Sequence, residues 1–131
     1  MSIVETERID GVPVARVRAD IDAASAASVH DVLAGALAPD TDCLIVDLSE
    51  TRYLDSAGLD MLLRLAERLS QRRVTLMLVI PEGSHVSRLA TIVGLPEALP
   101  VHPTLSDARD SCTTHSTLIA EEAERQKTAA G

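Results

Sequence analysis

The chain has 131 residues, 46% of them hydrophobic, which is enough material for one packed domain and leaves little room for a second. Its formal net charge of -8 would repel a nucleic-acid backbone, and Tyr53, the one aromatic residue, cannot supply the stacking surfaces of single-strand readers. No apolar run approaches the ~20 residues that span a bilayer, and the N-terminus is too charged for a signal peptide. We therefore expect a cytoplasmic protein that contacts neither nucleic acid nor membrane.

The first elements predicted along the chain are two strands. They cover Ile3–Arg8 and Val12–Ala19, and the Asp10-Gly11 pair between them is a turn signal of the kind that closes hairpins. We expect these strands to form an antiparallel hairpin.

A helix and a buried strand should follow. Apolar residues recur at helical spacing over Ala23–Leu37, and Asp22 or Ser25 could cap the start of this helix. The nearly continuous apolar run Cys43–Leu48 is typical of a central strand that is covered on both faces.

The strongest helical pattern comes next, a leucine-rich stripe over Leu59–Leu69. It is followed by another buried strand, Val74–Ile80, and by a short helix that Ser84 caps and Gly94 ends.

The last predicted elements are weaker. Ala98–Val101 could add a short strand, which Pro100 restricts to the edge of the sheet, and Thr104 should cap a final helix. Alternating strands and helices predict one α/β domain over residues 1–112, with parallel pairing in the middle of a small mixed sheet and about four flanking helices. The tail, residues 113–131, could be helical or partly disordered.

The two cysteines could form one disulfide. Because Cys43 opens a buried strand and Cys112 lies in a polar helical segment near the far end, we favour reduced thiols in a cytosolic protein.

The turn before the leucine-rich helix holds the main candidate site, the hydroxyl of Ser56. A helix N-terminus favours an anion, and a phosphate there would add about -1.5 to -2 charge. Spacing alone favours a plain N-cap serine instead, worth about 1 kcal/mol, although a cap can also accept phosphate. Gly58 implies either an unusual backbone angle or the close approach of a partner.

Three aspartates could contribute to this site. Asp20 and Asp22 lie between the end of the second strand and the start of the first helix. Loops at one edge of a parallel sheet cluster, so their carboxylates should lie near Ser56. Asp55 could orient the hydroxyl or a metal–nucleotide that a partner brings. Each of the three could also be a simple helix cap or a solubilising loop residue.

Signatures of enzymes are missing from the sequence. There is neither a phosphate-binding glycine loop nor a nucleophile elbow around Ser56, and the four histidines do not stand at metal-ligand spacing. We expect no catalysis, no cofactor and no resident metal.

The segment Leu44–Leu59 resembles the hallmark of the STAS domain family, and most closely that of the bacterial anti-sigma factor antagonists. An apolar strand ends in Asp-Leu-Ser, and Asp-Ser-x-Gly-Leu then leads into a leucine-rich helix. Asp20-Ile21-Asp22 with Ser25, and Arg88-Leu89 with Val93-Gly94-Leu95, also resemble the family. The resemblance covers about residues 3 to 110.

This resemblance implies a phosphorylation switch. Ser56 matches the serine that a cognate anti-sigma kinase phosphorylates, and Ala57 stands where many relatives have a second hydroxyl. The unphosphorylated protein would bind the anti-sigma factor and release a sigma factor for transcription, and a phosphatase would restore this state. The residues expected at the partner surface are Asp20, Asp22, Asp55, Ser56, Ala57, Gly58 and Asp60.

Two alternatives remain. STAS-like domains also serve as accessory subunits of transport machines or of stress-sensing assemblies. A small α/β hydrolase or nucleotide-binding enzyme is a further possibility, which loss of turnover in Ser56→Ala would reveal.

Overall fold

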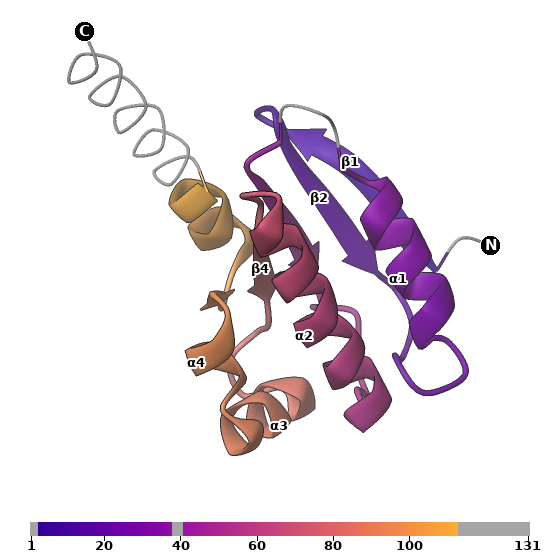
Figure 1. Cartoon of the computed structure of the whole chain (residues 1–131). Coiled ribbons are helices and arrows are strands. Elements are labelled where there is room, and N and C mark those ends of the chain that lie inside the picture. The colour runs from indigo at the N-terminus through magenta and orange to yellow at the C-terminus, as the bar shows by residue number, and fades with distance from the viewer. Residues whose placement is uncertain (1–2, 38–40, 113–131) are drawn as a thin grey trace, which may run out of the picture.

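The structure is a computed structural model and describes residues 3–37 and 41–112 (Figure 1). Its sheet has five strands in the order of the chain: β1 (Val4–Ile9), β2 (Val12–Val17), β3 (Cys43–Asp47), β4 (Thr75–Val79) and β5 (Val101–His102). β1 and β2 pair antiparallel, and the other neighbouring strands pair parallel. The antiparallel hairpin on a parallel centre is therefore confirmed.

Four helices lie between the strands along the chain: α1 (Ala26–Gly35), α2 (Ser56–Gln71), α3 (His85–Val93) and α4 (Leu95–Ala98). Residues 105–112 form a further helix, and the Thr104 hydroxyl caps it by accepting the amide of Asp107 at 3.1 Å. Together with the five strands, these helices confirm the mixed α/β class.

The boundaries differ from the predictions by one or two residues at most strands, and by more at two places. α1 begins three residues later than expected, because the Asp22 carboxylate accepts the amides of Ala24 and Ser25 and holds them in a turn. α4 was not predicted, since Pro96 bars continuation of the helix that ends at Gly94. A proline in the first turn of a helix is tolerated, however, and the edge strand starts only at Val101.

Within residues 3–37 and 41–112, different helices cover the two faces of the sheet. α1, α2 and α3 lie over one face, where they pack on side chains such as Val46 and Leu78 (Figure 1). On the other face Ile45 and Met77 pack against the helix of residues 105–112, which contributes Ala108 and Cys112. The larger core therefore lies beneath α1, α2 and α3.

The prediction of reduced thiols is wrong for this structure. Cys43 and Cys112 form a disulfide, with their Cα atoms 6.2 Å apart, and no cysteine is free. Leu105, Ala108 and Cys112 make one stripe of the final helix, and this stripe docks on the face to which Cys43 points. The polar surroundings of Cys112 in the sequence concealed this stripe.

Within residues 3–37 and 41–112, no helix combines the length and the apolar character that a membrane span requires.

Candidate functional site

Two loops meet at the carboxyl ends of β2 and β3. The loop after β2 and the loop before α2 form a parallel bridge between Ile21 and Leu54. The amide of Ile21 donates to the carbonyl of Tyr53, and the amide of Asp55 donates to the carbonyl of Ile21, both at 3.1 Å. These bonds fix the Ser56 turn to the segment that contains Asp20 and Asp22.

Asp55 is the residue that caps α2. Its backbone is extended, with φ -96° and ψ -176°, and one carboxylate oxygen accepts the amide of Gly58 at 2.9 Å. The other oxygen accepts the amide of Ala23 at 3.3 Å, across the two loops. One side chain thus satisfies an N-terminal amide of α2 and also holds the neighbouring loop.

Ser56 is consequently the first residue of α2, and its interpretation as the N-cap is wrong. Its side chain is exposed, and no hydrogen bond engages its hydroxyl among the described residues. The hydroxyl lies at the positive end of a 16-residue helix. It is therefore accessible to a second protein, and a phosphate attached to it would lie in a favourable field.

The other two aspartates mainly shape the loops. Asp20 is exposed, and its carboxylate accepts the amide of Tyr53 at 3.1 Å, which brings it to the Ser56 loop. Asp22 accepts the amides of Ala24 and Ser25, each at 3.0 Å, within its own loop. The structure thus joins Asp20 to the turn and leaves Asp22 to act locally.

Gly58 is buried where the two loops meet. A Cβ atom at this position would lie 2.5 Å from Leu54 Cδ1 and 2.7 Å from the carbonyl oxygen of Ile21. The close approach that the sequence implied is therefore made by the chain itself.

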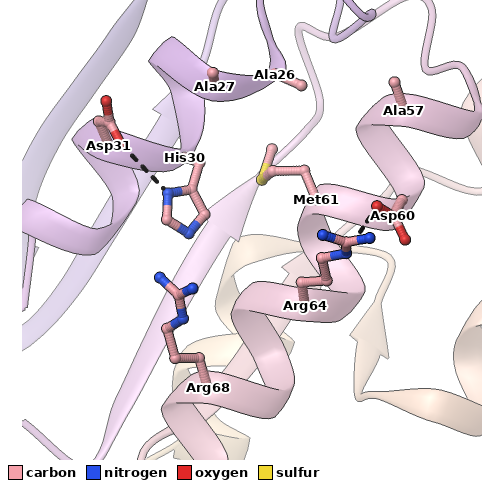
Figure 2. A pocket seen from close by; sticks show the side chains of 9 residues that line it. All are labelled: Ala26, Ala27, His30, Asp31, Ala57, Asp60, Met61, Arg64 and Arg68. Atoms are coloured by element: carbon pink, nitrogen blue, oxygen red, sulfur yellow. Dashed lines mark hydrogen bonds and ion pairs between the residues drawn. The ribbon is translucent and has the colours of Figure 1, made fainter.

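A groove between α1 and α2 adjoins the Ser56 turn. It has a volume of about 320 Å³, and Asp60 and Ala57, both expected at the partner surface, line it (Figure 2). The sequence analysis missed the groove. The available signal was the spacing of Ala57, Met61, Arg64 and Arg68, which places them on one side of α2. The complete lining is Ala26, Ala27, His30, Asp31, Ala57, Asp60, Met61, Arg64 and Arg68.

The described residues contain no group of three or more His, Cys, Asp or Glu side chains that could hold a metal ion. What the geometry of the described residues offers is an exposed hydroxyl on a hydrogen-bonded turn, beside a groove.

Comparisons with known proteins agree with this architecture. The model of the STAS domain family matches residues 4–108. The chain is 29% identical over 99 residues to the anti-sigma-F factor antagonist RsfB of Mycobacterium tuberculosis, covering 76% of this chain and 80% of that protein.

Solved structures share the fold. The crystal structure of an anti-sigma factor antagonist from Mycobacterium paratuberculosis matches with a TM-score of 0.70 at 28% identity, over 84% of this chain and 92% of that one. A crystal structure from Thermotoga maritima matches with a TM-score of 0.74 at 16% identity, over 84% and 94% of the two chains. The protein described here therefore belongs to the STAS domain family.

Proposed function

We propose that the chain is an anti-sigma factor antagonist that phosphorylation of Ser56 switches off. The observation that carries this proposal is the exposed, unbonded hydroxyl of Ser56 at the start of α2, in a turn that Asp55 caps. The similarity to proteins named as anti-sigma factor antagonists supports it. The unphosphorylated form binds an anti-sigma factor in the cytoplasm and so releases a sigma factor.

The chain acts here as a binding protein and not as an enzyme. The anti-sigma factor is a serine kinase that supplies ATP and Mg²⁺, and a separate phosphatase removes the phosphate. The described part of the chain offers Ser56 as the acceptor, while Asp55 and the contacts of Gly58 hold the turn in place.

Phosphorylation should change binding far more than folding. The N-terminus of α2 tolerates an anion, so the phosphorylated turn keeps its shape. At the interface, however, a phosphate adds about -1.5 to -2 charge close to Asp55 and Asp60 and must be desolvated when a partner docks. The complex therefore dissociates although the antagonist remains folded.

The proposal is tested by mixing the purified chain with the candidate anti-sigma kinases of its genome and ATP, followed by intact mass and titration calorimetry. The wild type should bind one kinase and gain one phosphate, and Ser56→Ala should bind equally well and gain none. Ser56→Asp should bind at least about tenfold more weakly.

Ser28→Asp is the matched control, because Ser28 is an exposed serine in the first turn of α1. It should keep wild-type affinity. Normal transfer of phosphate to Ser56→Ala would show that the switch has been assigned to the wrong residue. Absence of binding to every anti-sigma factor would instead favour a role as an accessory subunit of a transport or stress-sensing assembly.

A further inference from the structure

We propose that the groove between α1 and α2 binds a short segment of the anti-sigma factor that carries carboxylates around an apolar anchor residue. This inference rests on the proposed function, since it names a second contact of the same partner. It extends the docking surface from the Ser56 turn along α2 and onto α1.

Charge is the first argument. The chain has a net charge of -8, yet this groove is lined by as many arginines as carboxylates. The arginines are Arg64 and Arg68, and the carboxylates are Asp31 and Asp60. Arg64 is paired with Asp60 at 2.9 Å, whereas Arg68 makes no ion pair with any described residue. Figure 2 shows the Arg68 side chain reaching from α2 toward His30 on α1. A carboxylate of the partner is the complement to this unpaired guanidinium.

The apolar lining is the second argument. Met61 is 7% exposed, and three small residues, Ala26, Ala27 and Ala57, line the groove beside it. The small side chains leave the space between the helices open, and a methionine adapts its shape to an apolar side chain. The groove therefore offers an apolar contact beside the guanidinium of Arg68.

Length and position favour a peptide segment over a small molecule. Ala57 adjoins Ser56, and α2 rises by about 16 Å from Ala57 to Arg68. That distance corresponds to about five residues of extended chain. A partner that docks on the Ser56 turn can thus continue along the groove without a break in the contact.

The experiment measures the dissociation constant between the full-length chain and the anti-sigma factor that binds the wild type, at low and high salt. Arg68→Glu should weaken the complex at least about tenfold at low salt, and less at high salt, because salt screens the repulsion of the partner's carboxylates. Arg88→Glu is the control, since Arg88 is exposed on α3 outside the groove and changes the net charge equally. It should bind within about twofold of the wild type.

A second pair of variants tests whether binding needs the open volume of the groove, independently of the charge of Arg68. Ala27→Trp fills the groove, whereas Ala34→Trp places the same side chain on an exposed position of α1 outside it. Only the first should weaken binding. Circular dichroism verifies that all four variants remain folded.

The outcomes separate the two proposals. If the wild type binds an anti-sigma factor, and Arg68→Glu and Ala27→Trp bind as tightly as their controls, the groove proposal is overturned while the Ser56 switch stands. If the wild type binds none, both proposals fail. If a small dianion such as inorganic phosphate competes with the anti-sigma factor in the wild type and not in Arg68→Glu, the groove is an anion site and the peptide segment is refuted.

Discussion

Gly58 shows how closely the two loops of the site are fitted to one another. Its Cα lies against the carbonyl of Ile21 and the side chain of Leu54, and these residues also form the bridge between the loops. A side chain at this position would have to displace backbone, which gives way less easily than the end of a flexible side chain. The position of the Ser56 hydroxyl thus depends on a neighbour that is itself buried.

We predict that Gly58→Ala lowers the free energy of unfolding by about 1–3 kcal/mol, because the new methyl group overpacks the junction of the loops. Urea denaturation measures the loss. Gly35→Ala is the control, since a Cβ at Gly35 meets nothing within 4 Å and alanine favours a helix by about 0.5–1 kcal/mol. Equal stability of Gly58→Ala and the wild type would refute the close packing.

The spacing of the sequence does not decide whether Asp55 or Ser56 caps α2. The sequence predicts a polar cap before the leucine-rich helix, but either residue has the chemistry to be that cap. Backbone geometry decides between them, since Asp55 is extended and Ser56 is already helical. Because the cap lies one position before Ser56, the Ser56 hydroxyl is exposed and makes no hydrogen bond among the described residues.

Among the helices and strands, the sequence patterns that gave correct predictions lie within single elements. The leucine stripe predicted α2, and the apolar runs predicted β3 and β4, because each pattern reflects the burial of one side or of both faces. The groove and the disulfide were not predicted. Each arises where elements far apart in the sequence meet, α1 with α2 and β3 with the helix of residues 105–112.

The disulfide links the helix of residues 105–112 covalently to the sheet. It joins residues separated by 69 positions, Cys43 at the start of β3 and Cys112. We predict that a reducing agent lowers the free energy of unfolding of the wild type by about 2–4 kcal/mol, the range for a cross-link that restricts a long loop of the unfolded chain. Thermal unfolding with and without dithiothreitol measures this difference.

Cys112→Ala serves as the control, since its stability should not respond to the reducing agent. If the reducing agent leaves the wild type equally stable, the disulfide contributes nothing to the fold. Because a cytosol keeps thiols reduced and an oxidising compartment does not, alkylation of freshly lysed cells followed by intact mass would establish which form is present in the cell.

Among the described residues, α1, α2 and α3 cover one face of the sheet and the helix of residues 105–112 covers the other. Every residue of β3 is buried, and this strand is paired on both sides, with β2 and β4. In the smaller core, on the face that Ile45 and Met77 share, residues 105–112 contribute Leu105, Ala108 and Cys112. Opening this helix exposes little apolar surface, so it should cost less free energy than opening the sheet.

We therefore predict that amide hydrogen exchange divides the oxidised protein into two units. The amides of β3 should exchange only through global unfolding, because no smaller opening frees a strand that is paired on both sides. The amides of residues 105–111 should exchange at least about tenfold faster, since the disulfide ties these residues to the sheet only through Cys112. Exchange followed by NMR under native conditions, with increasing low concentrations of urea, resolves the two sets. The β3 amides should depend steeply on urea and those of residues 105–111 weakly, because the slope reports the surface exposed in each opening. Equal rates and equal slopes would mean that the final helix unfolds together with the sheet, and the smaller core would then be an integral part of a single cooperative unit.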